Sequence, residues 1–523
     1  MTKRFNITGT CFPDPHYMVD ISDRVAQIKK MVDDNDYFCI NRGRQYGKTT
    51  TLNQAARSLS KEYSVFFISF EGMAESQFES VESLAYTFLR RLRSGMASET
   101  TETVSSPMYS QLQSMIENRK TDKKIDIDDL DDFITELCRS SQKKIVLMID
   151  EVDQASNYKS FLEFLGLIRK KYLARAQNPT FQSVILAGVY DIKNLKLKIR
   201  PDAEHQYNSP WNIATNFDVD MSFNVSDVEN MLHEYENEHH SGMDTHAIAQ
   251  WIIDYTSGYP FLVSKICKTI DEKNLTWNYA GILEAVKQLL VEQNTLFDDM
   301  NKKLSDFPTL RDMLKDILYN GETYKYNIDD KSTELAKMFN FIFNDHGIVK
   351  ISNRIFETRL YNAFAFEEEN KSQLVQESYI DKNQFIENGQ LNIEKIMQRF
   401  IVHFQDIYGD RDDKFVENEG RKYFMFYIKP IINGVGNYYI EARTRDNLRT
   451  DMIIDYLGHQ YVIEMKIWRG DSYNKRGEQQ LLEYLDAYHL DKGYMMSFCF
   501  NKNKHPGIHT VRIGHREIVE GIV

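Results

Sequence analysis

The stretch YFCINRGRQYGKTTTLNQAARSL, residues 37–59, decides the fold of the first part of this chain. The apolar run at 37–41 is typical of a buried strand, and residues 50–63 place apolar side chains at helical spacing. A loop that enters a helix in this way presents backbone N–H groups and the positive end of the helix dipole to a phosphate. The stretch therefore predicts a strand, a phosphate-binding loop and a helix.

The loop and the first helical turn contain the residues that we expect to bind a nucleotide. They are Arg42, Gly43, Arg44, Gln45, Tyr46, Gly47, Lys48, Thr49 and Thr50. Lys48 can reach the β- and γ-phosphates of ATP, and Thr49 can hold Mg²⁺. In the pattern G-x-x-x-x-G-K-[ST] the first glycine would fall on Arg42, but here glycine comes one place later. The loop therefore adopts a variant geometry, or Arg42 points at phosphate or at a neighbouring subunit.

A second apolar run, KKIVLMID at 143–150, predicts another buried strand, and it ends in Asp150 and Glu151. Many ATPases place a metal-holding acid and a water-activating base after such a strand. We expect Asp150 to lie beside Mg²⁺ and Glu151 to polarise the attacking water. Further strands at 64–70 and 183–189, separated by helices, predict a parallel sheet with its chemistry at the carboxyl ends of the strands.

These motifs resemble the AAA-ATPase-like family, P-loop proteins related to the archaeal-type and STAND ATPases. The resemblance covers roughly residues 1–365 and is carried by 37–52, 143–154, 183–197 and 257–263. It implies an Arg-containing loop before GK[ST], which accounts for the displaced glycine. It also implies a sensor of the γ-phosphate, for which Asp191 and Asn194 are alternatives, and a Gly-Pro lid motif at SGYP (257–260).

A second group of charged residues lies near the C-terminus, on two short expected strands. Asp451 stands at the start of the strand 450–458, and Glu464 and Lys466 lie on the next strand, 459–468. A separation of 13 residues suits a hairpin that brings both acids to one edge. Two carboxylates can bind Mg²⁺ or Mn²⁺, and Lys466 points to the same face of its strand as Glu464. There the lysine can orient a water or stabilise charge on a phosphate.

The following helix, 475–489, carries Gln480 and Tyr484 on one face. This Q-x-x-x-Y pattern after an ExK strand resembles one branch of the PD-(D/E)XK nucleases, which implies an αβββαβ order and another metal-binding acid upstream. Glu419 is our candidate for that acid, and Glu417 and Glu441 compete with it. A polyanionic substrate would find basic side chains nearby, namely Arg443, Arg445, Arg449, Arg469, Lys475 and Arg476.

The fold class that we expect is α/β: a P-loop parallel-sheet ATPase with a helical lid and a winged-helix-like module, plus a C-terminal restriction-endonuclease-like domain. Strand–turn–strand character is expected at the end of the module, within 346–364. The expected segments are the P-loop ATPase core (1–215), the helical lid (216–290), the winged-helix-like module (291–365), a linker (366–395) and the αβββαβ domain (396–523).

Composition bounds the partners without choosing one. The chain has 523 residues, an apolar fraction of 42% and only 10 prolines, which excludes collagen-like and mostly disordered classes. Residues 396–523 hold 18 basic and 18 acidic side chains, so the net charge of −13 belongs to the preceding residues. Five scattered cysteines argue against a disulfide framework. No membrane-spanning run or signal peptide is evident, so we expect a soluble, cytoplasmic protein.

Two hypotheses of function follow from these observations. In the first, Mg·ATP at the P-loop is coupled to metal-dependent cleavage of nucleic acid, with DNA as the expected partner. In the second, the chain is an ATP-dependent regulatory or signalling switch whose nuclease-like domain only binds nucleic acid. A homo-oligomer is possible in both, because related ATPases often extend an arginine into a neighbour's nucleotide site.

Overall fold

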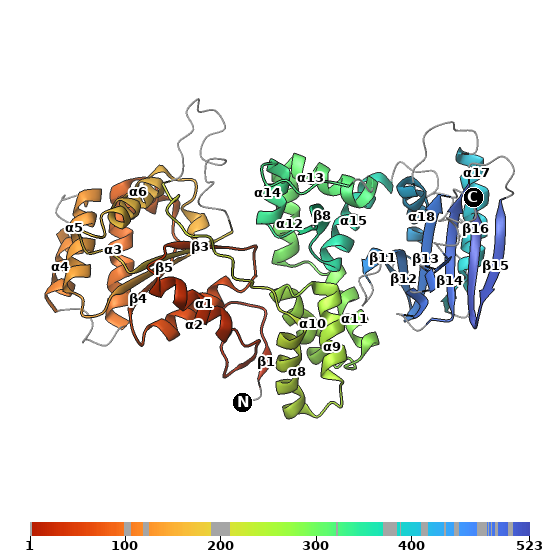
Figure 1. Cartoon of the computed structure of the whole chain (residues 1–523), viewed down its shortest axis with the longest axis horizontal. Coiled ribbons are helices and arrows are strands. Elements are labelled where there is room, and N and C mark those ends of the chain that lie inside the picture. The colour runs from red at the N-terminus through yellow and green to blue at the C-terminus, as the bar shows by residue number, and fades with distance from the viewer. Residues whose placement is uncertain are drawn as a thin grey trace.

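The computed structural model of the chain is elongated, with the N-terminal core at one end and a mixed sheet at the other (Figure 1). Its description covers most of the chain, in segments that are separated by short gaps. The described residues are 3–98, 106–118, 125–189, 210–320, 323–369, 384–387, 389–408, 417–432, 436–443, 449–467, 478–479, 481–482, 484–486, 490–499 and 506–523.

A four-stranded parallel sheet forms the N-terminal core, in the order β3-β6-β5-β4. Its strands are β3 (Phe38–Asn41), β4 (Ser64–Ser69), β5 (Ile145–Asp150) and β6 (Ser183–Gly188). All four expected strands are present, and the expected parallel sheet is confirmed. Beyond β3, Phe38 forms a further parallel bridge with Thr215. The P-loop strand β3 therefore lies one strand away from β5, with β6 between them.

Helices cover both faces of this sheet because alternate residues of each buried strand point to opposite sides. On β5, Val146 and Met148 pack in one core with α1 and α2, whereas Leu147 and Ile149 pack in another with α3, α5 and α6. The helices are α1 (Ser22–Asp33), α2 (Lys48–Leu59), α3 (Val81–Ser98), α4 (Ser106–Asn118), α5 (Ile127–Ser140) and α6 (Lys159–Leu173). Short strands β1 (Arg4–Phe5) and β2 (His16–Tyr17) precede them.

Four helices follow the core: α8 (Val225–His239), α9 (Thr245–Thr256), α10 (Pro260–Glu272) and α11 (Tyr279–Val291). Pro260 occupies the first turn of α10, where its missing N–H is tolerated. Helix α8 is capped by the side chain of Asn224, which accepts a hydrogen bond from the backbone N–H of Asp227.

The next module contains helices α12 (Thr295–Asp306), α13 (Pro308–Lys315) and α14 (Lys331–Met338), with a π-helical turn at Asp316–Asn320. Strands β7 (Ile342–Asp345) and β8 (Ile348–Ile351) then form a hairpin, and α15 (Arg354–Glu369) ends the module. The expectation of strand–turn–strand structure within 346–364 is therefore wrong in its second half, which is helical. Phe356, Leu360 and Phe364 bury a stripe at helical spacing there.

The C-terminal region is a six-stranded mixed sheet in the order β11-β12-β13-β14-β16-β15. Its antiparallel part consists of β11 (Gly436–Arg443), β12 (Arg449–Tyr456) and β13 (His459–Ile467). Strand β14 (Lys492–Phe498) joins β13 and β16 (Arg516–Ile522) in parallel, and β15 (Gly507–Ile513) is the antiparallel edge. Helices α17 (Ile393–Tyr408) and α18 (Glu417–Ile432) precede the sheet, after the short pair β9 (Ile386–Glu387) and β10 (Gln390–Leu391).

Helices lie on both faces of this second sheet as well. On one face, a Cβ placed on Gly521 of β16 would lie 2.8 Å from the side chain of Met397 in α17. On the other face, a Cβ on Gly493 of β14 would lie 3.0 Å from Leu485, within the helical segment 478–486. The expected order of strands, helix and strand between 436 and 498 is thus present. Within the described ranges, no helix combines the length and apolar character that a bilayer crossing requires.

Candidate functional sites

The loop between β3 and α2 bends so that the helix begins directly at the phosphate-binding lysine. Gly47 precedes α2 with a φ of 80°, in the left-handed region that glycine adopts without strain. Lys48 is the first residue of the helix, so the free N–H groups of the first turn lie beside the loop. This geometry provides an anion site at a helix N-terminus, as the sequence predicted.

The ammonium group of Lys48 lies inside the loop and is buried. Nζ donates hydrogen bonds to the backbone carbonyls of Arg42 at 3.1 Å and of Gly43 at 3.0 Å. Burial lowers the pKa of Lys48, and the nearby acids Asp153 and Glu151 oppose that shift. A buried cation held only by neutral carbonyls and by acids at a distance is well placed to receive an anionic ligand.

Thr49 and Asp150 meet at the carboxyl end of the sheet, although 101 residues separate them in sequence. The hydroxyl of Thr49 donates to Oδ2 of Asp150 at 2.6 Å, and Oδ1 of Asp150 accepts the backbone N–H of Glu151 at 2.9 Å. The hydroxyl and the carboxylate are hard oxygen ligands of the kind that Mg²⁺ prefers. The residues present therefore fit a magnesium ion between Thr49 and Asp150.

Glu151 leaves β5 with a φ of 56°, a left-handed conformation that is uncommon for a residue with a side chain. Burial raises the pKa of its carboxyl, with the Lys48 charge opposing the shift. Nearby, Oδ2 of Asp153 accepts the backbone N–H of Val189 at 2.6 Å, which ties the ends of β5 and β6 together. The alternatives for the sensor, Asp191 and Asn194, lie outside the described residues.

Arg42 has a different place from the rest of the loop. Its guanidinium donates to the carbonyls of Asn41 at 2.9 Å and Val219 at 2.8 Å, and it lies 5.6 Å from the centroid of the Phe217 ring. These contacts fasten the segment that follows the core to the base of the loop. Neither Arg42 nor Gly43 lines the nucleotide-sized cavity described next.

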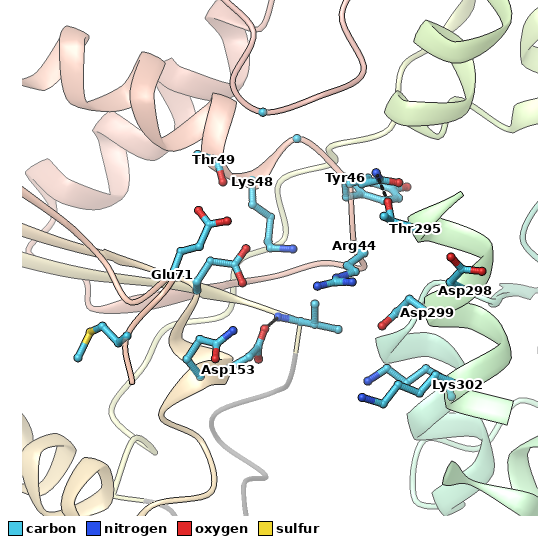
Figure 2. Close-up of a pocket in the computed structure, with 18 of the residues that line it drawn as sticks. Arg44, Tyr46, Lys48, Thr49, Glu71, Asp153, Thr295, Asp298, Asp299 and Lys302 are labelled. Carbon is cyan, nitrogen blue, oxygen red and sulfur yellow. Dashed lines mark hydrogen bonds between the residues drawn. The ribbon is translucent and has the colours of Figure 1, made fainter. Parts of the chain in front are cut away.

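A cavity of about 1010 Å³ opens in front of the loop, and its far wall comes from helix α12 (Figure 2). The core contributes Arg44, Lys48, Thr49, Glu151 and Asp153 to this cavity, together with Glu71 after β4. The module around α12 also contacts the loop directly. Nε2 of Gln45 donates to the hydroxyl of Thr295 at 2.9 Å, and the hydroxyl of Tyr259, the residue before α10, donates to the carbonyl of Arg44.

The first glycine of the loop, Gly43, is explained by the same packing. A Cβ at position 43 would lie 3.2 Å from the backbone oxygen of Phe339 and 3.4 Å from the hydroxyl of Tyr259. The loop thus needs its glycine where Phe339 and Tyr259 touch it, one place later than the usual pattern.

A smaller, more apolar cavity of about 340 Å³ lies on the other side of Tyr46 and Gly47. It is lined by the N-terminal segment, by the chain before α8 and by the start of α10. The lining residues include Ile7, Val19, Phe223 and Phe261. The backbone N–H of Cys11 donates to the hydroxyl of Thr50 at 3.1 Å and so fixes this segment against α2. Its size and apolar lining suit a nucleobase. The sequence analysis missed these residues, because no spacing in the sequence relates residues 7–19 to 223 or 261.

In the C-terminal sheet, Glu464 and Lys466 lie on the same face of β13 and form an ion pair of 2.8 Å. Glu464 is fully buried and Lys466 is partly buried. The antiparallel register pairs Met452 with Ile463, and one step further it sets Asp451 opposite Glu464. The expected hairpin is therefore present, with both acids at facing positions of the backbone.

Two further acids that the sequence analysis did not single out lie on this face. Asp455 pairs in register with Gln460, four residues before Glu464, and its side chain is fully buried. Glu520 of β16 accepts a hydrogen bond of 2.6 Å from the hydroxyl of Ser497. Tyr484 is buried in the helical segment that covers this face. The signal of Asp455 and Glu520 in the sequence is weak, since each of these two acids lies in an apolar strand without a motif.

Several predicted residues of this second site are not described in full. Gln480, Arg445, Arg469, Lys475 and Arg476 lie outside the described residues. Glu417 and Glu419 fall in the first turn of α18, so Glu419 lies within this helix and not before it, and only the backbone is described there. The same holds for Glu441 and Arg443 on β11 and for Arg449 and Asp451 on β12. Among the described side chains, no three His, Cys, Asp or Glu form a metal-binding group.

The chain is similar to several known structures, at low sequence identity and low TM-score. A Walker-type ATPase of Pyrococcus abyssi is 14% identical, with a TM-score of 0.47 over 68% of this chain and 99% of that one. The RuvB Holliday junction branch migration motor of Thermotoga maritima is 11% identical, with a TM-score of 0.31 over 63% and 92%. Cdc6p of Pyrobaculum aerophilum is 11% identical, with a TM-score of 0.30 over 70% and 97%.

No curated protein matches the chain in sequence. A family match is clear, however, and it covers the parallel sheet and helices α8 to α15. The model of the AAA-like domain matches residues 25–365, about two thirds of the chain. Both the P-loop with Lys48 and the acids after β5 fall within this range. The chain therefore belongs to the AAA-like domain family of P-loop ATPases.

Proposed function

We propose that this protein binds and hydrolyses ATP in its AAA-like domain, and that this cycle is coupled to metal-dependent hydrolysis of phosphodiester bonds by residues 396–523. The substrate of the second reaction is a nucleic acid, with DNA as the first candidate. The observation that carries the second half of the proposal is the Glu464–Lys466 pair on β13, with Asp451 opposite Glu464 in register.

In the AAA-like domain the triphosphate would lie across the N-terminus of α2, where the free N–H groups and Lys48 neutralise its charge. Thr49 and Asp150 would hold Mg²⁺, whose charge stabilises the leaving phosphate. Glu151 is the candidate base: burial raises the pKa of its carboxyl, which makes it a stronger proton acceptor than an exposed glutamate. Four residues of the loop and of helix α2 line both cavities, namely Gln45, Tyr46, Gly47 and Thr50.

In the C-terminal domain Asp451 and Glu464 would hold Mg²⁺ or Mn²⁺, with Glu419 as a further candidate ligand. Oxygen ligands of this kind suit either ion, which would activate a water for attack on phosphorus. Lys466 would orient that water or stabilise the charge that develops on the phosphate. Gln480 and Tyr484, from the helix over the same face, would position these groups. The order of three antiparallel strands, a helix and a parallel strand supports a restriction-endonuclease-like domain.

The test is cleavage of circular single- and double-stranded DNA with Mg²⁺ or Mn²⁺, with and without ATP. Wild type is compared with Asp451→Ala and with Asp406→Ala, which removes an exposed acid from α17 as a matched control. We expect cleavage that needs metal and is lost only in Asp451→Ala. Cleavage that survives in Asp451→Ala would rule out this site, and its dependence on ATP would define the role of the first domain.

The alternative, an ATP-dependent switch that grips nucleic acid without cutting it, has one observation in its favour. The phosphate loop is joined by Gln45 to the winged-helix-like module and by Arg44 to the lid. A change in the loop on nucleotide binding would therefore reach both. ATP hydrolysis without cleavage of any nucleic acid would favour this alternative, and a change of oligomeric state between ATP and ADP would support it directly.

A further inference from the structure

Helix α12 presents a stripe of polar side chains to the nucleotide cavity. Thr295, Asp298, Asp299 and Lys302 all line it, and their spacing of three or four residues places them on one face of the helix. In Figure 2 the side chains of Asp299 and Lys302 extend from α12 toward the open space in front of Arg44 and Lys48. The far wall of the cavity is thus charged, and it belongs to a module that begins about 250 residues after the P-loop.

The two neighbouring lysines of α12 have different surroundings. Lys303 is buried, and its ammonium lies 4.9 Å from the centroid of the Phe339 ring, so it belongs to the core of the module. Lys302 is exposed, and its side chain makes no hydrogen bond or ion pair with any residue that the structure describes. Lys302 is therefore available to an anion in the cavity.

Tyr46 and Gly47 line both cavities. With its base in the smaller, more apolar cavity, a nucleotide would extend its phosphate chain past these two residues toward α12. Lys48 and the N-terminus of α2 take the phosphates next to the loop. The phosphate at the far end of the chain then lies in the larger cavity, between the acids after β5 and helix α12.

The charges on the α12 wall favour a role for its exposed cation in binding an anion. Asp298 and Asp299 line the cavity one turn before Lys302, and carboxylates repel a polyphosphate in a confined site. Without Lys302 the whole wall from α12 would be neutral or acidic, apart from the buried Lys303. Arg44 and Lys302 stand on opposite sides of the space, so a phosphate between them meets one cation from each wall (Figure 2).

We propose that Lys302 contacts the terminal phosphate of a bound nucleoside triphosphate, so that the winged-helix-like module completes the nucleotide site of its own chain. This inference rests on the proposed nucleotide binding at the P-loop. The module would then distinguish a triphosphate from a diphosphate, because a diphosphate lacks the phosphate that Lys302 contacts and leaves this lysine near Asp298 and Asp299 only. The occupant of the cavity thereby sets how firmly α12 is held against the core.

The test is equilibrium binding of ATP and ADP, together with steady-state ATP hydrolysis, in a series at one position. Lys302→Arg keeps the charge, Lys302→Met removes it and Lys302→Glu reverses it. The matched control is Lys337→Met, an exposed lysine of α14 in the same module and outside the cavity. Thermal unfolding of each variant separates a loss of contact from a loss of fold.

We expect Lys302→Met to weaken ATP binding about tenfold and ADP binding much less, with a greater loss in Lys302→Glu and near wild-type values in Lys302→Arg and Lys337→Met. The KM for ATP should rise with the dissociation constant. Equal losses for ATP and ADP, or an unchanged ATP affinity in Lys302→Met, would overturn the inference. If wild type itself binds no nucleotide, or if Lys48→Ala binds ATP normally, the proposed function of the P-loop fails instead.

Discussion

The two candidate sites of this chain both contain a buried acid near a lysine, but they differ in where the sheet holds them. Asp150 stands at the carboxyl end of a parallel strand, beside the N-terminus of α2 and an open cavity. Glu464 lies within β13, on the face of a mixed sheet, with a helical segment over that face. The first position is an edge that leaves room for a ligand, and the second is part of the core.

The partners of the two lysines differ in the same way. Lys48 is held by backbone carbonyls and has no carboxylate within ion-pair distance among the described residues. Lys466 is paired with Glu464 at 2.8 Å. Nucleotide phosphate can therefore join Lys48 without breaking an ion pair, whereas a substrate at the second site competes with Glu464 for Lys466. The comparison teaches that the first candidate site is open as it stands, whereas a ligand of Lys466 at the second would have to displace Glu464.

The largest expected effect separates the two sites completely. Lys466→Ala should abolish nucleic-acid cleavage and leave ATP binding intact. Lys48→Ala should reduce ATP hydrolysis by about 10²- to 10³-fold, because it removes a preorganised positive charge from the phosphates. Phosphate release and DNA cleavage are measured on both variants, with Lys61→Ala as an exposed lysine control beyond α2. Loss of ATP binding in Lys466→Ala would mean that the sites are not separable.

The next prediction concerns Glu151, whose carboxyl has a raised pKa because of burial. Glu151→Gln should bind ATP and lose hydrolysis by about 10²- to 10⁴-fold. A general base acts as the carboxylate, so the rate of the wild type should fall as the pH drops through this raised pKa. The fall should come at a higher pH than for an ordinary glutamate. The pH profile of kcat is the measurement, and a profile that stays flat down to pH 5 would contradict the assignment.

A smaller effect tests whether the second site is part of the core. Lys466→Met leaves the buried carboxylate of Glu464 without its ion-pair partner and should lower the free energy of unfolding by about 3 kcal/mol. Thr49→Val removes only the hydrogen bond to Asp150, and we expect about 1 kcal/mol. Denaturant unfolding, followed separately for the two domains, measures both. Equal losses would remove the distinction between an edge site and a core site.

The smallest expected effect concerns Arg42, which our sequence analysis assigned to nucleotide binding. Its hydrogen bonds run to the carbonyls of Asn41 and Val219. Arg42→Ala should therefore lower stability by about 1–2 kcal/mol and change the KM for ATP less than threefold. Calorimetric unfolding and ATP titration of the same preparation provide the two numbers. A large rise in KM without a change in stability would restore Arg42 to the nucleotide site.

The first candidate site could be predicted well from the sequence, because the residues that define it lie close together in the chain. The strand, loop and helix of residues 37–59 are contiguous. Buried strands such as β5 (Ile145–Asp150) are recognised in the sequence by their apolar runs. The parallel order of the sheet then brings Thr49 and Asp150 together without further information. What the loop pattern could not explain was Gly43, since its cause is the backbone oxygen of Phe339, almost 300 residues away.

The remaining differences have the same physical origin in long-range contacts. Residues 354–364 contain apolar side chains at both strand-like and helical spacing, and packing of Phe356 and Leu360 against the module selects the helix. The strands β15 and β16 were not predicted. Strand β15 is an edge strand whose side chains are mostly half-buried or exposed, and the apolar run of β16 is interrupted by Glu520 and Gly521. Helix α12 gave no motif at all, and only its position across the cavity makes Lys302 a candidate.

The contact between Gln45 and Thr295 also has a consequence for the order in which the nucleotide site forms during translation. About 250 residues separate the two side chains in sequence. At roughly 5–20 residues per second, the ribosome needs on the order of 10–50 s to reach α12 after the P-loop has been made. During that interval the parallel sheet can assemble, but the cavity has no far wall. A nascent chain would therefore bind ATP at a complete site only after α12 has been synthesised. A chain released before residue 302 would lack the wall that completes the site.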